Sequence, residues 1–305
     1  GEKEVYEVTT QSGFKIRASL NHPFFTINGW RQLIDLKEGD YVATPRVIEH
    51  QHTKSDLKDE EIVLLAHMIG DGCYVKRQPV HYTSEDEASL DVVENCAKLL
   101  WKIEARRVKD SSSKRCYHLY LPAPYPLTHG VKHPFTNLLE RVGLNQVRSF
   151  NKTIPQAIFK STQEQIALFI KHLWATDGGI FIRKGKGSAK IYYSSTSIDL
   201  IQGLKSLLLR FEINSTINKS QKENYRPGYT LNITGKNNIM AFAEKIGIFG
   251  SKATTLRELV KICKNKDTVP NSDVISKKLW NEIRELKKKK GFTERGFQSA
   301  LGSQY

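Results

Sequence analysis

Two aspartates, Asp71 and Asp177, stand at equivalent places in two similar stretches of the sequence. The stretches read LLAHMIGDGCYV (64–75) and LFIKHLWATDGGIFI (168–182), and each is an apolar run of helical type that ends at Asp-Gly. A carboxylate at the C-terminal end of a helix meets the negative end of the helix dipole, which costs roughly 0.3–1 kcal/mol. The last carbonyls of a helix also lack intrahelical partners. A divalent cation would remove both penalties, because carboxylate and carbonyl oxygens are hard ligands that suit Mg²⁺.

Each aspartate also has a plainer interpretation, since Asp-Gly is a favourable turn sequence and a single occurrence would indicate only the end of a helix. Two occurrences in a repeated unit, on a basic chain, favour a metal site formed by Asp71 and Asp177. If the two helices pack side by side, both carboxylates should face the floor of one continuous sheet. Such packing needs small residues at the seam, and the sequence supplies Ala66, Gly70, Ala175 and Gly178.

The order of predicted elements repeats around the two aspartates. The first set has helices at 61–71, 87–104 and 134–142, with strands near 73–83 and within 106–121. The second set has helices at 163–177, 197–211 and 236–246, with strands at 180–183, 189–195, 214–219 and 229–234. Both sets follow the order α-β-β-α-β-β-α, and neither can comfortably bury its own sheet and first helix. The two should therefore pack together in an α+β fold.

Three segments flank the repeats. Residues 1–46 alternate like short strands separated by turns such as QSG and NG, which predicts an all-β segment. Residues 47–60 are polar and lack an apolar period, which indicates a linker. Residues 251–305 are predicted to be a basic helical extension, with apolar residues of DVISKKLWNEIRELKKKK on one stripe. This extension is either an amphipathic helix with solvated lysines or a helix-turn-helix-like DNA contact.

Charge and hydropathy limit the classes of function. The chain has 305 residues, with 47 Lys and Arg against 32 Asp and Glu, and a net charge of +15. This excess favours a polyanion partner, nucleic acid before a membrane surface. Apolar runs fall short of the ~20 residues of a membrane span, and residues 1–10 do not resemble a secretory signal. Four cysteines without C-x-x-C spacing argue against zinc or disulfides and favour a reducing, cytoplasmic location.

Basic residues gather in the segments that follow each aspartate. A curved basic sheet suits a DNA duplex, in which Lys and Arg meet phosphates while Gln or Arg reads base edges. Lysines that protect a sheet edge are the plainer alternative. The candidate DNA contacts are Lys76, Arg77, Gln78, His81, Arg183, Lys184, Lys186 and Lys190.

The stretches LLAHMIGDG and IKHLWATDG resemble the paired LAGLIDADG motifs of single-chain homing endonucleases. This resemblance covers residues 61–250, and residues 61–305 also resemble the nuclease insert of large inteins. It implies tandem αββαββα repeats, at 61–160 and 161–250, with saddle-shaped antiparallel sheets. It also implies that Mg²⁺ is bound by Asp71, Asp177 and the carbonyls of Gly70 and Thr176. His172 departs from the motif, because it replaces a small residue and puts the tightness of the seam in question.

The family's active sites carry basic residues near the cleft, and two lysines follow the aspartates at similar distances. They are Lys152 in NKTIP and Lys252 in GSKAT, although a surface position in a lysine-rich chain is an equal alternative. The resemblance implies a monomeric, Mg²⁺-dependent endonuclease that cuts both strands of a long specific DNA site and leaves short 3′ overhangs. Mn²⁺ is expected to substitute for Mg²⁺, and Ca²⁺ to support binding only.

The segment SGFKIRASLNHPFFTINGWRQLIDLKEGDYVATPR resembles part of the splicing (Hint) domain of inteins. In that family a Ser/Thr-x-x-His element polarises the N-terminal splice junction, and it maps onto Ser19 and His22. The family's nucleophile and His-Asn pair are replaced here by Gly1 and by Gln304-Tyr305. The chain is therefore expected to be an excerpt of an intein that does not splice alone. The overall pattern is most similar to inteins of bacterial replicative DNA helicases.

Two other functions fit parts of the sequence. One is a DNA-binding protein of the same fold that does not cleave, against which both retained aspartates argue. The other is a protein-splicing module with an inert insert, against which the missing terminal splicing residues argue. The sequence does not reveal the recognition site.

Overall fold

The computed structural model describes residues 2–49, 56–111, 113, 115–183, 189–265, 277–293 and 296–297. The chain divides into two compact units. The first comprises Gly1–Val8, Ile16–Thr44 and Asn271–Tyr305, and the second comprises Thr9–Lys15 and Pro45–Pro270. Among the helices of the described ranges, none is both long enough and apolar enough to cross a membrane.

Two short hairpins form the N-terminal part of the chain. Strand β1 (Tyr6–Thr9) pairs with β2 (Lys15–Ala18), and β3 (Pro23–Thr26) pairs with β4 (Gly29–Gln32), followed by a 3-10 turn at Leu33–Asp35. Gly29 has a φ of +88°, which explains the glycine at the predicted Asn-Gly turn. Helix α9 (Lys277–Lys289) is the one long element of the first unit's C-terminal portion within the described residues.

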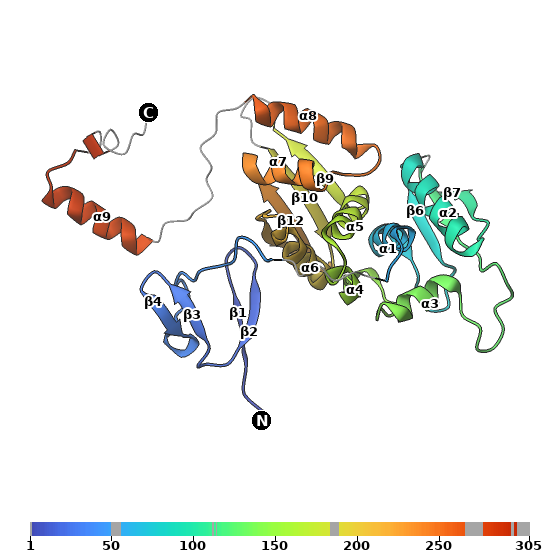
Figure 1. Ribbon diagram of the computed structural model, residues 1–305, viewed down its shortest axis with the longest axis horizontal. Helices are drawn as coiled ribbons and strands as arrows, with labels where there is room; N and C mark the ends of the chain where they lie inside the picture. The colour runs from blue at the N-terminus through green and yellow to red at the C-terminus, as the bar shows by residue number, and fades with distance from the viewer. Residues whose placement is uncertain are drawn as a thin grey trace. The chain divides into compact units, whose positions relative to one another are not determined.

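The second unit consists mainly of two sets of elements with the same order (Figure 1). The first set is α1 (Asp59–Asp71), β5 (Gly72–Cys73), β6 (His81–Ser84), α2 (Glu87–Trp101), β7 (Arg106–Lys109), β8 (Tyr117–Tyr120) and α3 (Pro134–Arg141). The second set is α5 (Gln163–Ala175), β9 (Gly178–Ile182), β10 (Ala189–Ser195), α6 (Ile198–Leu209), β11 (Thr216–Ser220), β12 (Gly228–Thr234) and α7 (Lys236–Lys245). A 3-10 turn (Ser149–Asn151) and α4 (Gln156–Phe159) join the sets, and α8 (Lys252–Lys264) follows. The predicted α-β-β-α-β-β-α duplication is confirmed.

Each set forms its own antiparallel sheet, in the orders β5-β6-β8-β7 and β11-β12-β10-β9. The expectation of one continuous sheet is wrong. The strands that directly follow the aspartates, β5 and β9, are edge strands, and no ladder joins them in the described part of the chain. The two sets are held together by helices instead.

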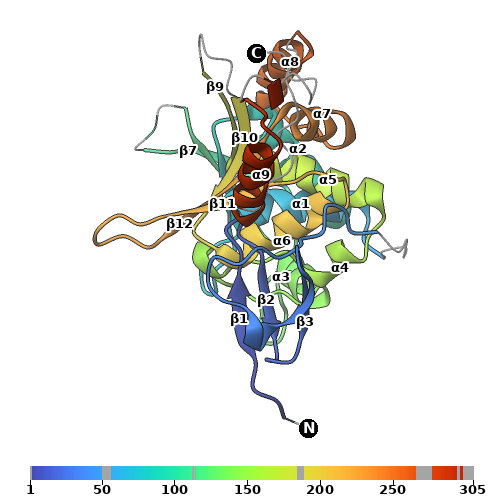
Figure 2. The same cartoon turned by 90° about the vertical axis from the view of Figure 1, so that its left-hand side faces the viewer.

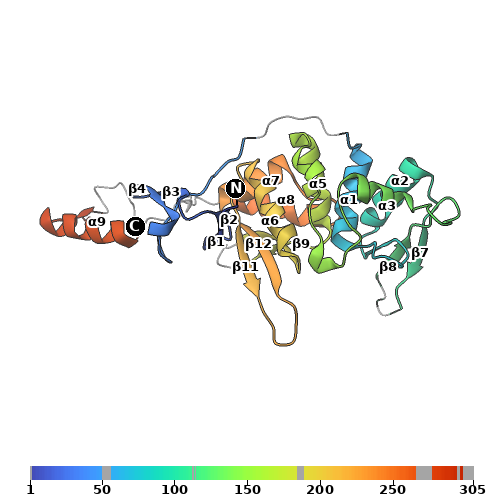
Figure 3. The same cartoon turned by 90° about the horizontal axis from the view of Figure 1, so that it is seen from below.

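Helices α1 and α5 lie side by side at the centre of this unit (Figures 1 and 3). Most of their residues are buried, as is typical of helices inside a core. His67 Nε2 and His172 Nδ1 are hydrogen-bonded across the seam at 3.0 Å, and the Tyr82 hydroxyl lies 3.0 Å from His67 Nδ1. His172 also stacks on Phe249 with ring centroids 4.4 Å apart. The concern that His172 loosens the seam is therefore wrong, because the ring is packed and hydrogen-bonded.

Gly70 allows the two helices to approach most closely at their C-terminal ends. A Cβ atom added there would overlap the side chain of Thr176. Gly178 was expected at the same seam, but a Cβ at that position would instead meet Trp174 of the preceding helix. The prediction for Gly178 is therefore wrong, and this glycine allows the chain to turn tightly from α5 into β9.

Two predicted helix ends also differ from the structure. Helix α2 ends at Trp101 rather than at residue 104, because Lys102 adopts a left-handed conformation with φ of 59°. Helix α5 ends at Ala175, so Asp177 lies just beyond the helix rather than within it.

Replacing Gly70 with alanine should destabilise the protein. Overpacking of this kind costs about 1–3 kcal/mol, which exceeds the gain in helix propensity of at most about 1 kcal/mol. Urea denaturation should therefore give a lower free energy of unfolding. Combining Gly70→Ala with Thr176→Gly should recover much of this loss, because the overlapping side chain is gone. Additive effects of the two changes would contradict the contact.

Candidate functional site

Asp71 and Asp177 lie at adjoining ends of the two central helices. Asp71 is the last residue of α1, and Asp177 follows Thr176, the C-cap of α5. The overlap expected between a Cβ at Gly70 and Thr176 shows that the backbones preceding the two carboxylates are in contact. The pKa of the half-buried Asp71 is raised to about 7, first by burial and then by the charge of Asp177, against the opposing effect of two lysines. The sequence prediction that the two aspartates come together is consistent with this geometry.

Asp177 is the more open of the two carboxylates. Its residue surface is exposed, while the protein packed behind it raises the pKa of its carboxyl. The positive charges of Lys152 and Lys252 act in the opposite direction. Asp71 differs from Asp177 in that its raised pKa has a like-charged neighbour as a second cause, after burial.

Two lysines bind the carbonyls at these helix ends. Lys152 Nζ donates to the carbonyl oxygens of Met68 (3.3 Å), Gly70 (2.9 Å) and Gly72 (2.9 Å) at the end of α1. Lys252 Nζ donates to those of Ala175 (2.8 Å), Thr176 and Gly178 (2.7 Å) at the end of α5. Each of the two helix ends thus carries one aspartate and is bound by one lysine, and these lysines are not ordinary surface side chains.

The surrounding protein limits the hydration of both lysine ammonium groups. Burial lowers the pKa of Lys152 to about 8 even though Asp71 and Asp177 raise it, and burial also lowers the pKa of Lys252. The Lys152 ammonium further lies 5.2 Å from the centre of the Tyr74 ring. Cations at helix C-termini offset the negative end of the dipole, so the two ammonium groups compensate both the unpaired carbonyls and the carboxylates.

The donor set is compatible with a divalent cation. Carboxylate and carbonyl oxygens are hard ligands, and a cation between two carboxylates would offset the repulsion that raises the pKa of Asp71. The carbonyls of Gly70 and Thr176 already accept from lysines, but a carbonyl oxygen has a second lone pair. No cluster of three or more His, Cys, Asp and Glu side chains suited to a metal occurs in the described ranges. A cation here would therefore depend on the two aspartates, backbone oxygens and water.

The strands lie on one side of the second unit and the central helices on the other (Figure 2). In the first repeat, Tyr82 and Leu119 are paired on the buried face of the sheet. Alternation puts their neighbours on the outer face, which carries His81, Thr83, Arg106, His118 and Tyr120. His118 lies 2.9 Å from Thr83 Oγ1 and 2.9 Å from Asp110 Oδ2. This outer face is polar, aromatic and basic.

The second sheet has the same two-sided character. Its inner face carries buried apolar residues such as Ile191 and Leu231. On the outer face Lys190 Nζ donates to Asn232 Oδ1 (2.9 Å), and Asn232 Nδ2 donates to Asn218 Oδ1 (2.8 Å). The hairpins β7–β8 and β11–β12 project to the same side of the unit, on either side of α1 and α5 (Figure 3). The two polar faces therefore flank the aspartates.

The residues predicted to bind DNA are only partly gathered on these faces. His81 and Lys190 are on the outer faces, Arg183 directly follows β9, and the trio Lys76, Arg77 and Gln78 lies in the turn between β5 and β6. Lys184 and Lys186 lie outside the described residues. Sequence reasoning missed Arg106, His118, Tyr120, Asn218 and Asn232, whose only signal is the alternation in β7, β8, β11 and β12.

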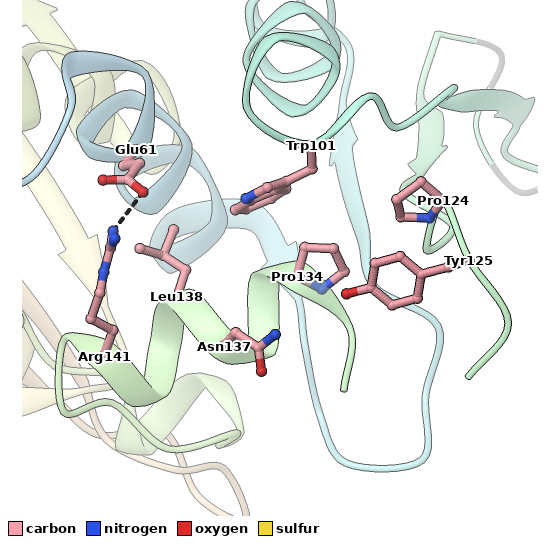
Figure 4. A pocket seen from close by; sticks show the side chains of 8 residues that line it. All are labelled: Glu61, Trp101, Pro124, Tyr125, Pro134, Asn137, Leu138 and Arg141. Atoms are coloured by element: carbon pink, nitrogen blue, oxygen red, sulfur yellow. Dashed lines mark ion pairs between the residues drawn. The ribbon is translucent and has the colours of Figure 1, made fainter. Parts of the chain in front are cut away.

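A separate pocket of about 330 Å³ lies at the other end of α1 (Figure 4). It is lined by Glu61, Trp101, Pro124, Tyr125, Pro134, Asn137, Leu138 and Arg141. Glu61 and Arg141 form an ion pair of 2.5 Å on its wall. Glu61 is in the first turn of a helix whose last residue is Asp71, about 15 Å away along the axis. The pocket is therefore not part of the carboxylate site.

Ser19 and His22, predicted as a splicing element, occupy one turn of the first unit. The His22 amide donates to the Ser19 carbonyl (2.9 Å), and Ser19 Oγ donates to Asn21 Oδ1 (2.7 Å). The His22 side chain is exposed and lies edge-on to Phe24, with centroids 5.2 Å apart. The turn brings the two residues near each other, and their chemical role stays a prediction.

A comparison with protein families matches residues 164–247 to the model of a LAGLIDADG-like domain. The matched stretch runs from α5 to α7 of the second repeat. Among solved structures, the chain is similar to mesophilic variants of the homing endonuclease I-DmoI. That similarity has 18% identity and a TM-score of 0.41, and covers 66% of this chain and 97% of that one.

Among curated proteins, the chain is similar to two bacterial helicases. It is 37% identical over its whole length to replicative DNA helicase DnaB of Rhodothermus marinus, of which it covers 33%. It is 35% identical over its whole length to replicative DNA helicase DnaB of Synechocystis sp., of which it covers 35%. The chain thus spans about a third of the length of these relatives.

Replacing Asp71 with asparagine should stabilise the metal-free protein most at alkaline pH. The folded-state pKa of Asp71 is about 7, above its ordinary value of 3.8. Its contribution to stability is therefore fully present below pH 4 and lost as the pH rises through 7. The advantage of Asp71→Asn in the free energy of unfolding should grow from pH 4 to pH 8 in urea denaturation. Asp59→Asn, at the exposed start of α1, is the control, and an equal gain there would contradict the account.

Proposed function

We propose that this chain is a metal-dependent DNA endonuclease that cuts both strands of a specific site. One observation carries the proposal. The adjoining ends of α1 and α5 each bring an aspartate together with a lysine that is held on the helix carbonyls. Two copies of one constellation in a single chain suit a substrate with two strands of opposite polarity. The net charge of +15 and the polar outer faces of both sheets support DNA as that substrate.

Asp71 and Asp177 would hold the cation, with the carbonyls of Gly70 and Thr176 as further oxygen donors. A bound Mg²⁺ supplies an acidified water and offsets the negative charge that develops on the phosphate. Lys152 and Lys252 would each bind the carbonyls of one helix end and add positive charge beside the position of that phosphate. The buried side of Asp71 limits access of bulk water to its carboxylate. We expect Mn²⁺ to replace Mg²⁺ and Ca²⁺ to support binding only.

The outer faces of the two sheets would bind the duplex on either side of the cut. Arg106 and Lys190 supply positive charge for phosphates, and the exposed Asn218 and half-buried His118 supply groups that can read base edges. The buried Asn232 holds Lys190 and Asn218 by hydrogen bonds. Both repeats, 61–160 and 161–250, would contribute in a monomer. The basic extension 251–305 would add affinity, although part of it lies outside the described residues.

The broader context of this nuclease would be an intein. The helicases that the chain resembles are about three times as long as the stretch that it spans, which suits an insertion carried by a host protein. The hairpins of residues 1–46 would then be part of a splicing domain, with Ser19 and His22 at the N-terminal splice junction. Segment 47–60 would be the linker between that domain and the nuclease.

Asp71→Asn and Asp177→Asn should each nearly abolish double-strand cleavage. Asparagine keeps the shape of the side chain but removes the anionic ligand, so we expect a loss of about a thousandfold or more in rate, ~4 kcal/mol in the barrier. DNA binding in Ca²⁺ should stay within about tenfold, ~1.4 kcal/mol. Plasmid cleavage in Mg²⁺ and filter binding in Ca²⁺ measure the two effects. Normal cutting by both variants would remove the chemical basis of the proposal.

Adjacent arginines on β7 offer a matched test of the DNA-binding face. Arg106 is exposed on the outer face, whereas Arg107 donates to Glu87 (2.9 Å), Asp91 (2.5 Å) and Glu94 (2.7 Å). Arg106→Ala should weaken DNA binding and reduce the slope of log affinity against log salt by about 1, because one phosphate contact is lost. Arg107→Ala should leave this slope unchanged. The reverse pattern would place DNA elsewhere.

A further inference from the structure

Lys152 is anchored on the opposite repeat. Its carbonyl oxygen accepts a hydrogen bond of 2.6 Å from Ser197 Oγ, and Ser197 is fully buried. Ser197 is the N-cap of α6, and its Oγ also accepts a hydrogen bond from the Leu200 amide at 3.2 Å. One hydroxyl of the second repeat thus caps a helix and also fixes the backbone of the lysine that serves the first repeat.

The chain that follows Lys152 continues along the same helix of the second repeat. Ile154 packs at Gly203 of α6, where a Cβ would come within 3.1 Å of Ile154 Cδ1. Arg210, the C-cap of α6, donates from Nη1 to the Phe159 carbonyl at 2.6 Å. The lysine's backbone is therefore fixed by the second repeat, while its ammonium binds α1 of the first.

Lys252 is held in the corresponding way by the first repeat. Asp86 is the N-cap of α2, the helix of the first repeat that corresponds to α6, and its Oδ2 accepts from the Ser89 amide at 3.2 Å. Its Oδ1 accepts from the amide of Ser251, the residue before Lys252, at 3.4 Å. A Cβ at Gly250 would overlap the Asp86 carboxylate, and Gly250 has a φ of +77°. Glycine is thus required where this turn meets the cap.

We infer that Asp86 and Ser197 are positioning residues in a crossed arrangement. The N-cap of the second helix in each repeat holds the lysine whose ammonium binds the central helix of the other repeat. Each lysine therefore reaches its place only when both repeats are folded and packed together. The inference rests on the proposed function only for the claim that the lysines serve cleavage, since the crossed anchoring is a property of the protein alone.

Lysine reactivity tests the crossed anchoring without DNA or metal. The full chain is acetylated briefly with an N-hydroxysuccinimide ester, and labelling of Lys152 and Lys252 is followed by peptide mass spectrometry. Ser197→Ala should raise the labelling rate of Lys152 about fivefold, as expected for loss of one hydrogen bond, and leave Lys252 unchanged. Asp86→Ala should do the opposite. Ser197→Thr and Asp86→Asn retain a hydroxyl and an acceptor, so they should restore protection.

Thr162→Ala is the matched control, because Thr162 caps α5 through the Gln165 amide at the N-terminal end of the helix, opposite the end that Lys252 binds. It should raise neither labelling rate. If Thr162→Ala acts like Ser197→Ala, or if one variant exposes both lysines equally, the arrangement is not crossed and the inference is overturned. Unchanged labelling in both Ser197→Ala and Asp86→Ala would overturn it as well.

Strand-resolved cleavage then links the anchoring to the proposed function. With DNA labelled on either strand, Ser197→Ala should slow one cut about fivefold and Asp86→Ala the other, each giving nicked intermediates. Equal slowing of both cuts would contradict separate positioning roles. If the wild-type chain cuts no DNA, the proposed function fails, while the labelling pattern still decides whether the crossed anchoring exists.

Discussion

At the adjoining C-terminal ends of α1 and α5, two carboxylates and the negative poles of two helix dipoles lie close together. This arrangement is unfavourable without added positive charge, and burial together with the charge of Asp177 raises the pKa of Asp71. Lys152 and Lys252 supply that charge from within the protein, and each binds three carbonyl oxygens of one helix end. Two ammonium groups balance two carboxylates, but they leave the carboxylate oxygens available to a further cation.

The rest of the second unit can be understood from this contact. The helices must be apolar on nearly all sides because they lie at the centre of the core, and Gly70 must lack a side chain because Thr176 fills its place. The histidine pair satisfies polar groups in the same buried seam. The sheets do not join, so each keeps an outer face of its own. Duplication thus gives each repeat one acid and one polar outer face, with one lysine bound at each of the two helix ends.

Much of this arrangement could be predicted from the sequence, and the limits have physical causes. The repeated helix–Asp–Gly pattern predicts the fold and the two aspartates, and the similar offsets of Lys152 and Lys252 predict their equivalence. The continuous sheet was wrong because hydropathy does not reveal which strands pair. Residues such as Asn232 and His118 were missed because four-residue to seven-residue strands carry a weak alternation signal. The contact between Ser197 and Lys152 joins distant segments and leaves no local pattern.

Anomalous diffraction from crystals of the protein with DNA and Mn²⁺ tests the central claim most directly. The account predicts an anomalous peak within coordination distance, about 2.0–2.2 Å, of carboxylate oxygens of Asp71 and Asp177. It also predicts that Lys152 and Lys252 remain hydrogen-bonded at the two helix ends. Mn²⁺ bound only elsewhere, such as beside His81 and His118 on the outer face, with none at the helix ends, would contradict it.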